Sequence, residues 1–163
     1  FDLARALRGA LPGALREAAV ALGIAAVVFP PFVVGFALWH GPSRPFAFEW
    51  PPEFATFALT QLVLVALPEE AFFRGYVQTR LHDRWPPRRR ILGAPLDVRV
   101  WLLQAALFAL VHVVSVPHPA RLAVFFPGLL FGWLRAWRGG IGAAMLLHAL
   151  SNVLARILET GWL

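Results

Sequence analysis

The sequence predicts an all-α fold, a polytopic bundle of transmembrane helices. Of its 163 residues, 59% are hydrophobic and 15% are charged, and the mean hydropathy is +0.65. Soluble domains are roughly 45–50% apolar and about 25% charged. A soluble chain of this length cannot bury such an apolar excess, whereas lipid can cover it. Because the sequence contains no internal repeat, one integral-membrane domain over residues 1–163 is sufficient.

Five apolar stretches are candidate membrane spans, each of which needs about 20 mostly apolar residues. They are residues 18–39, 54–81, 100–116, 122–137 and 140–157. The first contains Pro30 and Pro31, which should kink it, and it is longer than the apolar core of about 7–15 residues found in signal peptides. Residues 1–11 place leucines on one helical face and predict an N-terminal interfacial helix. The chain begins at Phe1 rather than at a methionine, which leaves an upstream segment open.

All fifteen basic residues are arginine, and their positions indicate a topology. If the N-terminus is cytoplasmic, eleven of them lie in cytoplasmic segments: Arg5, Arg8, Arg16, Arg80, Arg84, Arg88, Arg89, Arg90, Arg99, Arg135 and Arg138. Arg44 and Arg121 fall on the opposite side. This bias follows the positive-inside rule, so the net charge of +6 indicates topology rather than a nucleic-acid groove. Arginine in place of lysine suits a bacterial inner membrane, with the N-terminus in the cytoplasm.

Ionisable side chains lie deep inside three of the predicted spans. A charge at the centre of a span costs at least about 2.5–3.5 kcal/mol, so such residues require a functional explanation. At about 1.5 Å of rise per residue, Glu69 and His112 lie roughly 16 and 18 Å from the cytoplasmic ends of their helices. His148 and Asn152 lie roughly 12 and 18 Å deep. Three helices thus bring a carboxylate, two imidazoles and a carboxamide to nearly one level, where we expect a shared polar site.

Helical spacing adds detail to this site. Three pairs have the i,i+4 spacing that places both side chains on one face: Glu70 with Arg74, Phe108 with His112, and His148 with Asn152. The Glu70–Arg74 pair would offset part of its own insertion cost, while Glu69 would point about 100° away and stay available. Pro68 cannot donate a hydrogen bond to the carbonyl of Leu64, so it should bend the helix beside Glu69.

Each feature alone also has a purely structural interpretation. The Glu70–Arg74 pair could be a structural ion pair, and either membrane histidine could be a packing residue. Solvated histidines are expected at helix ends and in loops: His40, His82 and His118. The run 88–90 would be a lipid-facing topology anchor. Most tryptophans would be membrane-interface residues: Trp39, Trp50, Trp85, Trp101, Trp133 and Trp137. The coincidence in depth favours a functional site.

Three motifs resemble those of one known family. Residues 69–74, EEAFFR, resemble the EExxxR signature of the CPBP (CAAX protease and bacteriocin-processing, or Abi) intramembrane endopeptidases. Residues 108–112, FALVH, match its FxxxH element, and residues 148–152, HALSN, match its HxxxN element. The motifs follow the family's order, one in each predicted span, within a motif-bearing core of about residues 54–157. Residues 120–128 also resemble the myxosortase-like branch of the family.

The resemblance implies a glutamate-dependent intramembrane protease. Glu69 would be the general base that activates water, and His112 would hold that water. His148 and Asn152 would donate hydrogen bonds to the developing oxyanion. The supporting residues would be Glu70, Arg74 and Phe108. The substrate would be a membrane-embedded or lipidated peptide or protein in the lipid bilayer, including C-terminal sorting tails.

Several alternatives stay open. The glutamate mechanism needs no cofactor, but Glu69, His112 and His148 could instead supply three zinc ligands, although no HExxH motif is present. A membrane transporter or proton relay would also use membrane-embedded Glu and His, and a non-catalytic immunity-type membrane protein is a third class. The small size and the lack of a repeat oppose transport. With no cysteine in the chain, disulfides, thiol nucleophiles and cysteine metal sites are excluded.

Overall fold

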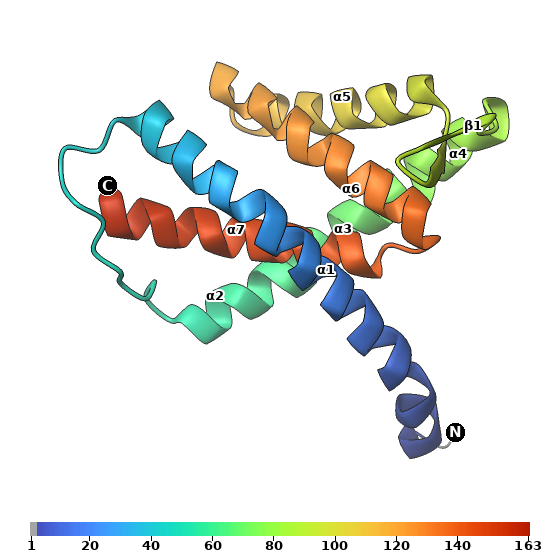
Figure 1. The fold of residues 1–163 in the computed structure, drawn as a ribbon, viewed down its shortest axis with the longest axis horizontal. Coiled ribbons are helices and arrows are strands. Elements are labelled where there is room, and N and C mark those ends of the chain that lie inside the picture. The colour runs from blue at the N-terminus through green and yellow to red at the C-terminus, as the bar shows by residue number, and fades with distance from the viewer. Residues whose placement is uncertain (1–2) are drawn as a thin grey trace. The chain divides into compact units, whose positions relative to one another are not determined.

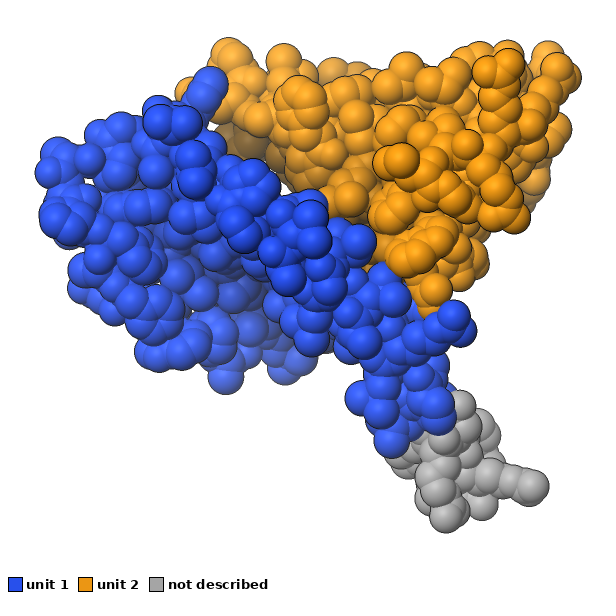
Figure 2. Space-filling model, viewed as in Figure 1, with its two compact units in different colours: residues 1–66, 146–163 blue, residues 67–145 orange. Residues whose placement is uncertain are grey.

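The computed structural model describes the backbone of residues 3–163 and the side chains of residues 10–163, and it is predominantly helical (Figure 1). The predicted all-α class is therefore confirmed. The chain forms two compact units (Figure 2). Unit 1 comprises Phe1–Ala66 and Leu146–Leu163, and unit 2 comprises Leu67–Met145. The single domain over residues 1–163 stays a prediction.

Unit 1 is built from three helical segments. Helix α1 spans Leu3–His40, and α2 spans Phe54–Thr60 and continues as the π-helical η1 over Gln61–Ala66. Helix α7 spans Gly142–Trp162, and its residues from Leu146 onward belong to unit 1. The α1 backbone continues through Pro30 and Pro31, as transmembrane helices permit. No break separates an interfacial helix from the first span, because α1 is continuous from Leu3. The predicted leucine face of residues 1–9 lies outside the described side chains.

The connection between α1 and α2 is held against the end of α7. The guanidinium Nε of Arg44 donates to the carbonyl of Trp162 at 3.1 Å, and the amide of Ala47 donates to the carbonyl of Gly161 at 3.1 Å. The ring of Phe46 packs edge-on against Trp162 at 5.1 Å. A Cβ at Gly161 would collide with the Phe46 ring, so glycine permits this close approach.

Unit 2 contains the remaining elements. They are α3 (Leu67–Glu70), the π-helical η2 (Ala71–Val77), α4 (Gln78–Arg84), β1 (Arg89–Ile91), β2 (Ala94–Leu96), α5 (Val98–Ser115), the 3₁₀ helix η3 (Pro119–Val124) and α6 (Phe125–Arg138). Helices α5 and α6 pack side by side (Figure 1). Their shared interior buries Phe108 from α5 together with Phe131 and Leu134 from α6. Asp97 caps the N-terminus of α5, where its carboxylate accepts from the amide of Arg99 at 3.0 Å.

Among the described residues, three helices are long and apolar enough to cross a membrane: Ala10–His40, Phe54–Arg84 and Val98–Ser115. The prediction of five spans is not confirmed. The predicted fourth span loses its first residues to the 3₁₀ helix, and the 14 residues of α6 extend roughly 21 Å, short of a hydrocarbon core of about 30 Å. Helix α7 has 21 residues, but its final turns carry Arg156 and Glu159.

The segment between α4 and α5 is a β-hairpin that the sequence did not lead us to expect. Strands β1 and β2 pair antiparallel, with Arg89 opposite Leu96 and Ile91 opposite Ala94. The two turn residues, Leu92 and Gly93, have φ values of 49° and 82°. A two-residue hairpin turn needs positive φ at both positions, and asparagine or aspartate usually precedes the glycine. Because Leu92 stands where asparagine or aspartate is usual, the sequence lacks the typical signal of a hairpin turn.

Two tryptophans that we expected at the lipid interface instead pack between this hairpin and the helices. The indole of Trp133 donates to the carbonyl of Ile91 at 3.1 Å, and the indole of Trp101 donates to the carbonyl of Leu129 at 2.7 Å. Both rings pack against a small buried cluster formed by Ala94, Leu96 and Ala136. Their N–H groups therefore serve internal packing, because partly buried indoles need a hydrogen-bond acceptor.

Candidate active site

The two adjacent glutamates lie in a short α-helical turn between two π-helical stretches. This turn, α3, follows η1 and precedes η2 within the continuous helical segment Phe54–Arg84. The i→i+5 bonding of η2 is seen where the amide of Gln78 donates to the carbonyl of Phe73. Pro68 lies in the α-helical turn and lacks the amide that would bond back to Leu64, which is part of η1. Single π-helical turns occur often at functional sites because they redirect side chains.

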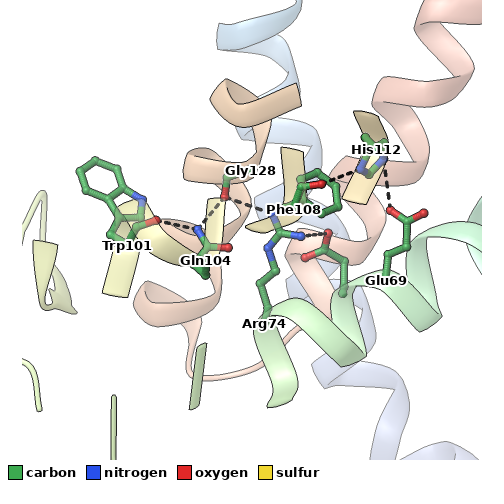
Figure 3. A network of polar contacts seen from close by, with 8 residues as sticks. Glu69, Arg74, Trp101, Gln104, Phe108, His112 and Gly128 are labelled. Atoms are coloured by element: carbon green, nitrogen blue, oxygen red, sulfur yellow. Dashed lines mark hydrogen bonds and ion pairs between the residues drawn. The ribbon is translucent and has the colours of Figure 1, made fainter. Parts of the chain in front are cut away.

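Glu69 faces His112 across a narrow gap (Figure 3). Its Oε2 lies 3.8 Å from the Nε2 of His112, too far for a direct hydrogen bond. The Glu69 side chain keeps 31% of its surface exposed and that of His112 keeps 21%, while the facing Oε2 atom of Glu69 is buried. The structure thus brings together this carboxylate and this imidazole from two different helices, and their shared depth in the membrane stays a prediction.

The tautomer of the His112 ring follows from its contact with the backbone of Phe108. Its Nδ1 lies 2.8 Å from the backbone carbonyl of Phe108, and a carbonyl oxygen can only accept. Nδ1 therefore carries the proton in this contact, so in the neutral imidazole Nε2 presents a lone pair toward Glu69. The Phe108 ring packs against the imidazole at 4.4 Å and 61°, which fixes the ring's orientation.

Glu70 points into a separate, fully buried network. Its Oε1 accepts from Arg74 at 3.0 Å, and neither side chain is exposed. The Arg74 guanidinium also donates to the carbonyl of Gly128 at 3.1 Å and lies 4.2 Å from the centroid of the Phe108 ring. The predicted i,i+4 pair is therefore present. Phe108 joins the network to the facing pair, because its ring contacts Arg74 while its carbonyl holds His112 (Figure 3).

The acceptors of this network were missed by sequence analysis. Gly128 and Gly132 form a GxxxG pattern in α6, and their carbonyls accept hydrogen bonds from the buried side chains of Gln104 and Gln78. Gln104 donates to Gly128 at 3.0 Å, and Gln78 donates to Gly132 at 2.9 Å. The small-xxx-small pattern and the lone glutamines in apolar helices are signals that could have found them, since both are typical of membrane helix contacts.

The third predicted motif lies on α7 in unit 1. His148 is buried, with 4% of its surface exposed. Asn152 is partly buried and donates its Nδ2 to the Oε1 of Gln61 in η1 at 2.9 Å. Gln61 was not singled out from the sequence, although a lone amide in an apolar helix is a recognisable feature. The meeting of His148 and Asn152 with Glu69 and His112 stays a prediction.

Two serines that could be mistaken for nucleophiles bond to their own helices. The hydroxyl of Ser115 donates to the carbonyl of Val111 at 2.9 Å, and that of Ser151 donates to Leu147 at 2.7 Å. For metal binding, unit 2, all of whose residues are described, has no group of three or more histidine and acidic side chains placed to hold an ion. Glu69 and His112 supply two donor atoms there.

Comparison with known proteins identifies the family. The family described as type II CAAX prenyl endopeptidase, Rce1-like, matches residues 50–154, a range that includes all three motifs. No curated protein and no solved structure matches the chain. The match does not confirm the myxosortase-like branch. Because it covers more than half of the 163 residues and the chain has three apolar helices able to span a bilayer, this protein is an integral membrane member of the Rce1-like CAAX endopeptidase family.

Proposed function

We propose that this protein is a metal-independent intramembrane endopeptidase in which Glu69 activates water to hydrolyse a peptide bond. The observation that carries the proposal is the facing pair, Glu69 Oε2 and His112 Nε2, at 3.8 Å. When Glu69 is ionised and His112 is neutral, both facing atoms are acceptors. A water molecule has two protons to donate. A single water placed about 2.8 Å from both Glu69 Oε2 and His112 Nε2 is compatible with their separation of 3.8 Å.

The proposed reaction uses this water as the nucleophile. As its oxygen attacks the substrate carbonyl carbon, one water proton passes to the Glu69 carboxylate. Collapse of the tetrahedral intermediate breaks the C–N bond, and Glu69 returns the proton to the leaving nitrogen. His112 orients the water through Nε2, because its Nδ1 is committed to the Phe108 carbonyl. A positioned general base of this kind contributes about 10²–10⁴-fold to the rate.

His148 and Asn152 are the proposed donors to the oxyanion. Both are polar side chains on one face of α7, and Asn152 is already oriented by Gln61. In the best-studied acyl-transfer case, a single donor of this kind stabilises the transition state by about 2.7–4 kcal/mol. This part of the proposal requires that face of α7 to meet the Glu69–His112 pair around the substrate.

The substrate class follows from the membrane location and the family. We propose a membrane-embedded or lipidated peptide or protein, cut within the membrane and including C-terminal sorting tails. The arginine distribution supports a cytoplasmic N-terminus in a bacterial inner membrane. The partners are therefore the substrate polypeptide and the lipid bilayer, and no nucleic acid.

The test begins with the products in cells. C-terminal peptides of membrane proteins are compared by mass spectrometry between cells carrying the wild-type protein and cells carrying Glu69→Ala. A substrate found in this way is then cleaved by purified protein in vesicles. Glu69→Ala and His112→Ala should lose cleavage while staying folded, and the matched control Glu159→Ala, an exposed acid on α7, should keep it. Undiminished cleavage by either site variant would rule out the assignment.

The same vesicles separate the metal-free mechanism from the zinc alternative and from transport. Cleavage should survive a chelator and should not rise when zinc is added. Loss of cleavage on chelation, with recovery when zinc is added, would instead identify Glu69 and His112 as zinc ligands. A Glu69-dependent ion flux without any product peptide would identify a proton relay instead.

A further inference from the structure

The hairpin between α4 and α5 presents an exposed basic surface. This surface, named the basic hairpin surface, consists of Arg84, Arg88, Arg89, Arg90 and Leu92. All five residues are exposed, and Leu92 at the turn keeps 82% of its surface accessible. An apolar side chain so exposed at the tip of an arginine-rich hairpin combines the two chemistries that attach proteins to membrane surfaces.

The charge on this segment is not neutralised within the segment. Residues 80–99 contain six arginines and two aspartates, a net charge of +4 with histidine neutral. Asp83 pairs with Arg80 at 3.3 Å, and Asp97 pairs with Arg99 at 2.8 Å. Both acids are thus held by arginines at the two ends of the segment. The arginines of the basic hairpin surface are left facing outward.

The position of the hairpin in the chain places it at a membrane surface. It directly links two helices able to span a bilayer, one ending at Arg84 and the next beginning at Val98. A short link between consecutive spans must emerge at one face of the membrane. Trp137 lies beside the turn, where a Cβ on Gly93 would be 3.9 Å from its indole nitrogen, and 41% of its surface is exposed. Exposed tryptophans typically lie at the level of the lipid headgroups.

The hairpin is also held rigidly. Trp133 stacks on Trp137 at 5.2 Å and donates to the carbonyl of Ile91, while Arg90 donates to the carbonyl of Gly93 at 2.8 Å. The arginines are therefore presented on a fixed element rather than on a loose loop, so less conformational entropy is lost when they bind.

We propose that the basic hairpin surface binds the headgroups of anionic phospholipids, with Leu92 entering the boundary between headgroups and acyl chains. Clustered basic residues next to a transmembrane helix are attracted to the negative surface potential of anionic membranes. The ligand is the lipid headgroup rather than an acidic protein, because both ends of the hairpin continue directly into apolar helices. This inference is independent of the peptidase proposal, since it needs neither Glu69 nor a substrate.

The absence of cysteine allows a direct test on the full chain. Leu92→Cys introduces a single thiol, which is labelled with an environment-sensitive fluorophore and reconstituted into vesicles. One set is phosphatidylcholine alone and the other is phosphatidylcholine with phosphatidylglycerol. Because both leaflets have the same composition, the orientation of insertion does not matter. The emission should shift to shorter wavelength in the anionic vesicles, and high salt should reverse part of the shift.

Two double variants test whether the emission shift depends on the arginines of the basic hairpin surface. Arg88→Gln with Arg89→Gln should move the docking equilibrium about 30-fold toward the undocked state, since each arginine near an anionic surface contributes about fivefold. The matched control, Arg16→Gln with Arg121→Gln, removes the same charge from exposed positions elsewhere and should keep the shift. Arg90 is left in place because it holds the turn.

Three outcomes would overturn the proposal. The first is the same emission in both sets of vesicles. The second is an equal loss of the shift in the control variant, which would assign it to net charge rather than to the hairpin. The third is a shift produced in phosphatidylcholine vesicles by polyglutamate but not by phosphatidylglycerol, which would assign the surface to an acidic protein.

Discussion

Two neighbouring glutamates occupy opposite environments in unit 2. Glu70 is completely buried and bonds to Arg74 at 3.0 Å, and Arg74 is in turn held by a backbone carbonyl and an aromatic ring. Glu69 is 31% exposed and faces His112 across 3.8 Å. Successive residues of a helix point about 100° apart, so the side chains of Glu69 and Glu70 face different environments although they belong to one helical turn.

The difference separates structure from chemistry. A buried charge is tolerable only when it is paired and hydrogen-bonded, which makes the Glu70–Arg74 network a fixed part of the packing. A catalytic carboxylate needs access to water and substrate, and Glu69 keeps 31% of its side chain exposed. Substitutions at Glu69 should therefore act on turnover, and substitutions in the Glu70–Arg74 network should act on stability.

Glu69→Gln should abolish most of the turnover without unfolding the protein. The amide keeps the size of the side chain but cannot accept the water proton, so kcat should fall by about 10²–10⁴-fold. Cleavage of the substrate identified in cells measures this, and thermal unfolding in detergent should match the wild type. A variant that unfolds early would instead place Glu69 among the structural residues.

Arg74→Met should lower the stability of the protein, in contrast to Glu69→Gln, which should lower only its turnover. Removing one partner of a buried ion pair leaves the Glu70 charge uncompensated, which typically costs about 3–5 kcal/mol. The free energy of unfolding in detergent should fall by that amount. The double variant Glu70→Gln with Arg74→Met should recover much of the loss, because it buries no charge. Equal stability of the single variant and the wild type would contradict a structural role for this network.

Gly132→Ala should perturb the network more mildly. A Cβ at this position would collide with the carboxamide of Gln104, which is buried and bonded to the carbonyls of Trp101 and Gly128. Overpacking of this kind costs about 1–3 kcal/mol. Gly35→Ala is the matched control, since nothing lies within 4 Å of its Cβ. If both variants unfold alike, the close contact between α5 and α6 does not limit stability.

The ion pair between Asp97 and Arg99 at the start of α5 should contribute the smallest effect, visible as a pH dependence of stability. Hydrogen bonds from the Arg99 side chain lower the pKa of Asp97 to about 2 from its usual 3.8. A lowered carboxyl pKa adds stability that is complete above the usual value and disappears as the pH falls through about 2. Unfolding between pH 5 and pH 2 should show a small loss, and Asp97→Asn should flatten it. If Asp97→Asn leaves the pH dependence of stability unchanged, the Asp97 cap does not contribute to the stability of α5.

Much of the candidate site follows from local geometry and could be predicted. The pairs Glu70–Arg74 and Phe108–His112 lie on single helices, where a spacing of four residues determines which side chains meet. The distribution of apolar residues likewise predicted the helical class and three of the spans. What could not be predicted are contacts between elements distant in the chain, such as the Gly128 carbonyl shared by Arg74 and Gln104.

The sequence by itself therefore determined the membrane setting, the helical class and the residue types of the site, because hydropathy and helical periodicity act over short distances along the chain. The tertiary structure alone decided that Trp101 and Trp133 serve internal packing and that residues 89–96 form a hairpin. These outcomes depend on which buried polar groups find partners across helices. That is a property of the packed molecule, since each unpaired group in an apolar interior is costly.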